Sequence, residues 1–331
     1  MTHPIPPGTR DILPSEMREL RALQASLASV FERFGYGEVA TPTVEYDEVL
    51  ARGDLSGAPA AHRFFDGDGG LLAMRSDSTV PIARLVANRY ADAELPLRFF
   101  YNARAYRAVR PQRGQMREFF QAGIELVGAE APAGTVEVVE ILAAALDAAG
   151  LERAVIGLGD AALYDGLLGE FAVPDEARSR ILALLAAHDL VSLGGELRAL
   201  DLDPSARELL ARIPALRGGP EVLEEARALG GQSAQRALER LEGTYRGLVE
   251  RGIEGRVRVD LGLLRDLGYY TGAILEVYDP ALGHILGGGG RYDDLMGRFG
   301  RPLPAVGFAL YLERVHIAQA EEERLASEEE A

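Results

Sequence analysis

The sequence predicts an α+β fold, in which a mostly antiparallel sheet is flanked by helices and interrupted by a helical insertion. Two observations predict this class. From Asp175 to Glu254 the leucines recur at helical spacing nearly throughout. Strand-like runs precede this segment and return after it, at Val257 to Leu261, Tyr269 to Tyr278 and Ala305 to Leu310. A sheet that begins before the insertion is therefore completed after it.

The first elements are a helix and a broken strand. Pro14 opens a helical pattern of apolar residues, and Gly35 ends it. Tyr36 to Glu45 then has strand character but is interrupted at Pro42, which has no N–H to donate to a sheet. We therefore expect a helix that packs on the core, followed by a short strand with a break.

A long hairpin comes next. Phe99 to Arg107 and Phe119 to Val127 are rich in aromatic and β-branched residues and flank an arginine-, glutamine- and glycine-rich connection, which predicts two antiparallel strands. Thr135 to Gly150 has the pattern of a capped helix, and Ala154 to Gly159 that of a short strand. The helical insertion follows, with candidate core residues Leu182, Leu184, Leu185, Leu190, Leu197, Leu209, Leu210 and Leu238.

These patterns divide the chain into four segments. The first part of the sheet domain spans residues 1–174, the helical insertion 175–254, the second part of the sheet domain 255–318 and an acidic tail 319–331. A chain of 331 residues with 47% hydrophobic content is long enough to bury a large core. No internal repeat is visible.

Composition favours a cytoplasmic protein that does not enter the membrane. No run approaches the roughly 18 consecutive apolar residues of a membrane helix, and the first residues lack the basic and apolar regions of a signal peptide. The sequence has no cysteine, which excludes disulfides and thiolate metal ligands, and its five histidines are scattered. We therefore expect neither a metal nor a cofactor.

Charge argues against nucleic acid as a partner. The formal net charge is −16, and every basic residue is arginine. Binding to a nucleic-acid backbone depends on a positive surface that displaces counterions. One short basic patch exists, and we expect it to meet a small anion or a partner protein: Arg104, Arg107, Arg110, Arg113 and Arg117. Because the chain has no lysine, the run Gly287 to Gly290 predicts close backbone packing rather than a phosphate loop.

One strand carries a polar face. In the run Phe119 to Val127, alternation places Gln121, Gly123 and Glu125 on one side and apolar residues on the other. A glycine between an amide and a carboxylate suits the floor of an amino-acid pocket, where Glu125 would hold an ammonium or an imidazole N–H. The alternative is a sheet face half covered by a helix, with Glu125 paired to an arginine. The strand alone leaves both open.

Four stretches, in this order and spacing, resemble the catalytic domain of class II histidyl-tRNA synthetases. They are Met74 to Thr79, Arg107 to Glu125, Leu264 to Gly272 and Gly289 to Leu295. Together the Tyr-Tyr-Thr-Gly and Gly-Gly-Arg-Tyr-Asp strings are far more specific than a lone glycine pattern. The resemblance implies a class II synthetase-like fold and a dimer formed through the Tyr36 to Glu45 region.

The resemblance also implies a pocket for histidine. Asp77 and Thr79 match positions that bind the α-amino group, although an aspartate here is also an ordinary helix cap. Arg265 matches the arginine beside the substrate carboxylate, a group that guanidinium engages with two hydrogen bonds. Tyr270 and Tyr292 match the walls of the imidazole slot. The candidate residues are Asp77, Thr79, Arg107, Gln121, Glu125, Arg265, Tyr269, Tyr270 and Tyr292.

The departures from the synthetase pattern fall on the nucleotide contacts. Arg107 is kept, but Val109 stands where the second class II motif has a glutamate. In the third motif Tyr311 replaces a glycine that leaves room beside adenine, while Arg314 is kept. Positions that match amino-acid contacts are therefore largely retained, and those that match ATP contacts are altered.

This asymmetry resembles that of the synthetase paralogues that act as regulatory subunits of ATP phosphoribosyltransferase. Only the acidic tail follows where a synthetase continues into an anticodon-binding domain. The resemblance implies no catalytic residue, assembly with the short-form catalytic subunit around a homodimer core in a hetero-oligomer or hetero-octamer, and histidine as effector. Two alternatives remain: an enzyme that forms histidyl-adenylate, and a stand-alone histidine-binding module.

Overall fold

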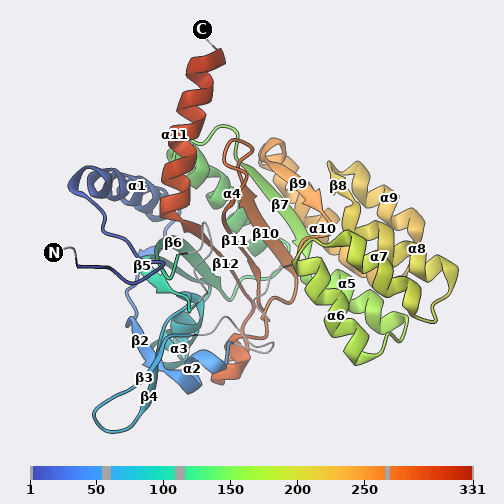
Figure 1. Cartoon of the computed structure of the whole chain (residues 1–331), viewed down its shortest axis with the longest axis horizontal. Coiled ribbons are helices and arrows are strands. Elements are labelled where there is room, and N and C mark those ends of the chain that lie inside the picture. Colours follow the sequence, from blue (N-terminus) through green and yellow to red (C-terminus); the bar gives the residue numbers. More distant parts are fainter. Residues whose placement is uncertain (1–2, 54–60, 109–115, 265–268, 330–331) are drawn as a thin grey trace.

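The structure is a computed structural model that describes residues 3–53, 61–108, 116–264 and 269–329. A nine-stranded sheet runs through its centre (Figure 1). In spatial order its strands are β1 (Gly37–Glu38), β5 (Leu97–Tyr106), β6 (Glu118–Val127), β12 (Ala305–Tyr311), β11 (Ile285–Arg291), β10 (Ala273–Tyr278), β7 (Val155–Asp160), β9 (Val257–Asp260) and β8 (Arg217–Gly218).

The sheet is mixed, which corrects the prediction of a mostly antiparallel sheet. From β5 to β7 the neighbours are antiparallel, but β1 runs parallel to β5 and β9 runs parallel to β7. A parallel neighbour requires a long crossover, whereas an antiparallel neighbour requires only a turn. The helical insertion between β7 and β9 supplies one crossover, and the segment between β1 and β5 supplies the other. The predicted hairpin of β5 and β6 is confirmed.

The predicted strand over Tyr36 to Glu45 is two strands in two different sheets. Its first part is β1, and its second part is β2 (Val44–Tyr46), in a small sheet with β4 (Leu71–Met74) and β3 (Arg63–Phe65). The predicted break at Pro42 is thus confirmed, but the change of sheet was not anticipated. Buried Arg75 fixes the turn, because its guanidinium donates to the Thr41 carbonyl at 2.7 Å.

Three long helices pack against one another and against the sheet. They are α1 (Pro14–Arg33), α4 (Ala133–Ala148) and α11 (Leu312–Glu329), and their apolar residues belong to the main core. The first two confirm the predicted helices, and Gly35 ends α1 with a φ of 81°. Residues 319–329, expected to be an acidic tail, instead continue α11, which projects from the body (Figure 1). No helix in the described ranges is both long and apolar enough to cross a membrane.

A second, smaller core holds the elements that form the candidate site. α2 (Asp47–Ala51), α3 (Thr79–Arg89) and the 3-10 helix η3 (Met296–Phe299) lie together here. Apolar residues of α3 pack with Tyr101 of β5 and with Tyr269 and Tyr292. The start of α3 is thereby held against the polar face of β6.

The helical insertion forms a separate group of helices beside the sheet (Figure 1). Residues 175–254 hold α6 (Asp175–Ala186), α7 (Leu190–Ala199), α8 (Pro204–Arg212), η1 (Ile213–Ala215), α9 (Glu221–Leu229) and α10 (Gln232–Glu250). Before them, α5 (Ala161–Glu170) packs on α10, and η2 (Glu254–Arg256) lies at the end of the segment. Arg240 of α10 joins it to β7 through two hydrogen bonds of 2.8 and 2.9 Å to buried Asp160. Most of the predicted core leucines are buried, but Leu190 is 39% exposed because it begins α7 at the surface.

Candidate functional site

Eight of the nine predicted site residues surround one cavity of about 30 Å³. Asp77 and Thr79 reach it from the start of α3, and Gln121 and Glu125 from β6. The other four are Arg107, Tyr269, Tyr270 and Tyr292. Arg265, together with Asp266, lies outside the described residues, so its predicted place beside a carboxylate stays a prediction. Segments far apart in the sequence therefore converge on one point.

Glu125 is a buried carboxyl held by two hydroxyl groups. It is 2% exposed, and its Oε1 accepts a hydrogen bond of 2.7 Å from Thr79, while its Oε2 accepts one from the Tyr292 hydroxyl. Burial raises the pKa of Glu125 well above its usual range, because removal of water penalises the charged form. These partners are neutral hydroxyls rather than the arginine of the alternative interpretation. A cation that enters the cavity would stabilise the ionised form.

Asp77 is the second acidic group at the cavity. Its Oδ1 accepts a hydrogen bond of 3.3 Å from the Val80 N–H in the first turn of α3, although the N-cap of this helix is the next residue, Ser78. Burial raises the pKa of Asp77, although the Arg107 guanidinium opposes the shift. Two carboxyls that resist ionisation thus face the same small space. This arrangement favours a ligand that carries positive charge.

Two further polar atoms at the cavity have no hydrogen-bond partner among the described residues. They are Gln121 Oε1 and Arg107 Nε, both buried. A buried acceptor or donor without a partner costs about 1–3 kcal/mol, which a ligand group of the right kind recovers. Gln121 and Glu125 lie on the same face of β6, because side chains alternate along a strand. The cavity therefore offers a ligand an acceptor and a donor in addition to its two carboxyls.

Tyr311 fills the opposite side of the site. Its ring lies 4.9 Å from the Arg314 guanidinium and 5.6 Å from that of Arg107, and Phe119 meets it edge-on at 5.4 Å. Arg107 also donates to the Tyr311 hydroxyl at 3.3 Å. The phenol thus occupies the space between the two arginines that the resemblance associates with ATP. Val109, the other altered nucleotide position, lies outside the described residues.

Close packing of glycines makes room for the site. Gly307 pairs with Glu125 across β12 and β6, and a Cβ on Gly307 would collide with the Glu125 carboxylate. A Cβ on Gly123 would lie 2.6 Å from the hydroxyl of Tyr101, a buried pocket residue that was not predicted. The cross-strand register of the hairpin, which pairs Tyr101 with Gly123, is the signal that would have revealed it. The glycines of β11 pack against β12 as predicted.

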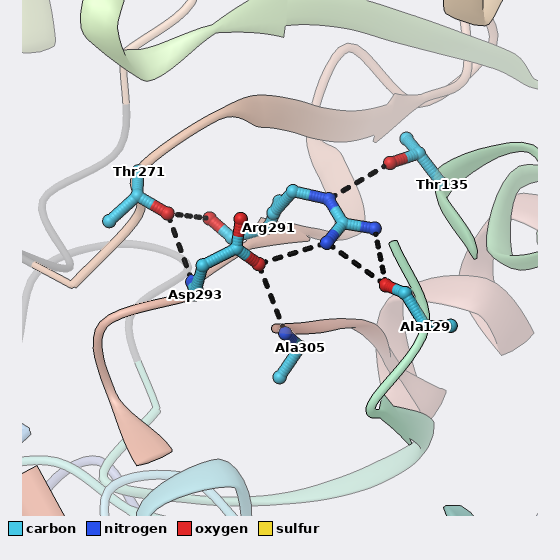
Figure 2. Close-up of polar contacts among 6 residues, drawn as sticks. All are labelled: Ala129, Thr135, Thr271, Arg291, Asp293 and Ala305. Carbon is cyan, nitrogen blue, oxygen red and sulfur yellow. Dashed lines mark hydrogen bonds and ion pairs between the residues drawn. The ribbon is translucent and has the colours of Figure 1, made fainter. Parts of the chain in front are cut away.

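A group of polar contacts, the polar clamp, joins Thr271 of one tyrosine-containing motif to Arg291 and Asp293 of the other (Figure 2). The Asp293 N–H donates to Thr271 Oγ1 at 2.9 Å, and the Thr271 N–H donates to the Arg291 carbonyl at 2.8 Å. Asp293 Oδ1 accepts from the Ala305 N–H at 3.0 Å, which ties this clamp to β12. Thr271, Arg291 and Asp293 lie inside the quoted motifs, but their role could not be assigned without the geometry.

Part of the basic patch is neutralised within the fold. Arg104 forms an ion pair with Glu118, and its guanidinium lies 4.5 Å from the Phe120 ring. Arg107 faces the cavity, whereas Arg110 and Arg113 lie outside the described residues. Two arginines of the patch, Arg104 and Arg107, therefore already contact side chains of this chain, Glu118 and Tyr311. The anion or partner protein expected at the patch stays a prediction.

Comparison with known proteins identifies the family. The model of the histidyl-tRNA synthetase family matches residues 8–315. A protein of Moorella thermoacetica named ATP phosphoribosyltransferase regulatory subunit is 44% identical over 96% of this chain and 82% of its own length. One of the same name from Symbiobacterium thermophilum is 41% identical over 98% of this chain and 82% of its own.

Solved structures give the same result. The fold matches a structure from Bacillus halodurans C, titled as an ATP phosphoribosyltransferase regulatory subunit/histidyl-tRNA synthetase, with a TM-score of 0.89 at 32% identity over 96% of this chain and 84% of that one. Histidyl-tRNA synthetase from Nostoc sp. PCC 7120 matches with a TM-score of 0.81 at 22% identity, over 98% and 76% of the two chains, which shows the shared fold. The chain therefore belongs to the histidyl-tRNA synthetase family and, within it, to the ATP phosphoribosyltransferase regulatory subunits.

Proposed function

We propose that this chain is the non-catalytic regulatory subunit that works with a short catalytic chain of ATP phosphoribosyltransferase in histidine biosynthesis, and that histidine binds in its cavity as effector. The position of Tyr311 carries the proposal. Its ring is held between Arg107 and Arg314, where a nucleotide would need space and free guanidinium groups. The amino-acid side of the site keeps its polar groups. A sensor of histidine needs that side alone.

Each polar end of histidine has a partner of suitable chemistry. Asp77 accepts from the ammonium, and Glu125 accepts from an imidazole N–H, with Gln121 beside it as a further acceptor. The aromatic rings of Tyr270 and Tyr292, whose centroids lie 6.4 Å apart, flank the imidazole. Arg265 is assigned to the carboxylate. The ligand thus adds a charge-assisted hydrogen bond to the two hydroxyl contacts that Glu125 already has.

Histidine entry requires the cavity to widen. A cavity of about 30 Å³ has room for a few water molecules but not for an amino acid. Tyr269 and Tyr292 are buried at 3% and 2% exposure, whereas Tyr270 is only half-buried. We therefore assign the movement to the Tyr270 side chain, which opens the slot and then closes over the imidazole. Binding is expected to order this ring.

The assembly follows from the same proposal. A homodimer core, formed through the region of β1 and β2, associates with the short catalytic chains in a hetero-oligomer, of which a hetero-octamer is one form. Two relatives of this chain are named ATP phosphoribosyltransferase regulatory subunit, and a regulatory subunit implies a catalytic subunit as its partner. We place the assembly in the cytoplasm.

Reconstitution with the short catalytic chain tests the proposed function. Formation of N1-(5-phospho-β-D-ribosyl)-ATP is measured with and without this protein, and histidine is then titrated into the mixture. We expect activity to depend on this subunit and to fall as histidine is added. Histidine-dependent exchange between ATP and pyrophosphate by this chain alone, at a rate typical of synthetases, would contradict the assignment.

A prediction on nucleic acid follows from charge. At a formal charge of −16, phosphate binding gains little from counterion release, so affinity for tRNA near physiological salt should be no better than nonspecific. Filter binding with histidine tRNA and an unrelated tRNA checks this. Saturation with histidine tRNA alone would show that a tRNA-binding surface exists.

A further inference from the structure

Arg291 does not line the pocket, and its side chain is 3% exposed and hydrogen-bonded through all three guanidinium nitrogens. Its Nε donates to Thr135 Oγ1 at 3.2 Å, and its two terminal nitrogens donate to the Ala129 carbonyl at 3.1 Å (Figure 2). It also forms an ion pair of 2.9 Å with Asp293. The guanidinium therefore joins the end of β11 to the first turn of α4 and the segment just before it.

The residue that follows Arg291 is the one that closes the pocket floor. Alternation along the chain sends Tyr292 to the opposite side, where its hydroxyl donates to Glu125 and its N–H donates to the Ala305 carbonyl at 2.8 Å. When the Arg291 guanidinium anchors the backbone at residue 291, the direction of the next side chain, that of Tyr292, is also restricted. The direction of Tyr292 thus depends on where the Arg291 side chain is anchored.

We propose that Arg291 is a positioning residue that holds the Tyr292 hydroxyl on the Glu125 carboxyl and so sets the geometry of the pocket floor. The part that concerns histidine affinity rests on the proposed function. Arginine suits this role because its planar fork reaches a hydroxyl, a carbonyl and a carboxylate at once, whereas lysine offers a single flexible ammonium. Thr135 and Asp293 hold the fork in place.

A double-mutant cycle between Arg291→Lys and Tyr292→Phe tests the proposal in the full-length protein. Unfolding by denaturant and calorimetric titration with histidine are measured for all four forms. We expect Arg291→Lys to weaken histidine binding roughly tenfold when Tyr292 is present, and less than about twofold further in Tyr292→Phe. The unfolding midpoints should show the same non-additivity, because both changes release the same hydroxyl.

The controls separate positioning from general destabilisation. Arg256 makes a similar set of contacts, to the Leu151 and Ala154 carbonyls and to Asp147, but contacts no pocket residue. Arg256→Lys should therefore add independently to Tyr292→Phe. Thr135→Val, which removes only the 3.2 Å bond, should reproduce part of the Arg291→Lys effect if the latter variant folds poorly.

Additive effects of Arg291→Lys and Tyr292→Phe on unfolding would overturn the role of Arg291. The unfolding cycle decides this whether or not histidine binds. A wild-type protein that gives no binding heat with histidine would instead refute the proposed effector site, while the unfolding cycle still reports on Arg291. The two failures are therefore distinguishable.

Discussion

We expect Glu125→Gln to lower the affinity for the proposed ligand, histidine, by about ten- to hundredfold, which corresponds to roughly 1–3 kcal/mol. Glutamine keeps the shape of the side chain and an acceptor for one hydroxyl, but it has no negative charge for the imidazole or ammonium. Alanine would be a less informative change, because it would leave the Thr79 and Tyr292 hydroxyls without their acceptor. Calorimetric titration of both proteins measures the loss. Equal affinities would mean that histidine binds elsewhere.

The same variant should be more stable than the wild type at neutral and alkaline pH. Burial raises the pKa of Glu125 in the folded state above its unfolded value near 4.5. The folded protein then holds this proton more tightly than the unfolded chain does, so stability falls as pH rises from the unfolded towards the folded pKa, by about 1.4 kcal/mol per pH unit. The glutamine amide does not ionise, so the stability of Glu125→Gln does not fall with pH for this reason. Melting temperatures measured across pH should therefore diverge in favour of Glu125→Gln as pH rises.

Glu313 supplies a matched control for both effects. Burial raises its pKa too, and its carboxylate accepts a hydrogen bond from the Phe120 N–H, but Glu313 does not line the cavity proposed for histidine. Glu313→Gln should show a similar change in the pH dependence of stability and leave histidine affinity unaltered. A Glu313→Gln variant that also lost histidine would show that the Glu125 result reflects general rearrangement of β6 and α11.

Local patterns predicted the elements whose formation is decided by neighbouring residues. Helix α1 ends where Gly35 adopts a positive φ, and the hairpin of β5 and β6 was visible from two strand-like runs and their connection. The parallel neighbours β1 and β9 were not visible. Their pairing depends on where long intervening segments return the chain, and no short-range pattern encodes that. The change of sheet at Pro42 was missed for the same reason.

The candidate site was predictable in its members but not in its contacts. Motif resemblance brought together residues from distant segments, and eight of them line one cavity. The arginine partner considered for Glu125 is not found among the described residues, where two hydroxyls contact the carboxyl instead, and its role toward a ligand stays a prediction. Tyr101 was missed because it lies in an aromatic strand with no polar pattern, and Arg291, although it lies in a quoted motif, could be given no role without its contacts. Their roles arise from cross-strand register and from contacts with α4.

Tyr311 is the residue that favours a regulatory subunit over a working synthetase, because both family arginines are retained in this chain. Arg107 and Arg314 could each meet a phosphate, so their presence alone would favour a working synthetase. In this chain both guanidinium groups lie on the Tyr311 ring, at 5.6 and 4.9 Å. A cation over an aromatic face is stabilised by about 0.5–2 kcal/mol, and a nucleotide must displace both contacts as well as the ring itself. We therefore expect Tyr311 to hinder nucleotide binding in two ways, because its ring takes up space and because it engages the two arginines that would meet the phosphates.

Tyr311→Gly should therefore gain nucleotide binding without gaining catalysis. Loss of a ring that is 9% exposed destabilises the protein by about 3–5 kcal/mol, so its melting temperature falls. Magnesium ATP at a hundredfold excess over its Kd should then restore about 2.7 kcal/mol, whereas the wild type should show no shift.

Tyr311→Phe is the control for this gain, because it keeps the ring and removes only the hydroxyl bonded to Arg107, and it should behave as the wild type does. ATP–pyrophosphate exchange should stay absent in Tyr311→Gly, since Val109 still lacks the carboxylate that orients ATP in the family. Stabilisation of the wild type by ATP to the same extent as Tyr311→Gly would show that the ring does not close the nucleotide space, and the case for a histidine sensor over an adenylate-forming enzyme would fail with it.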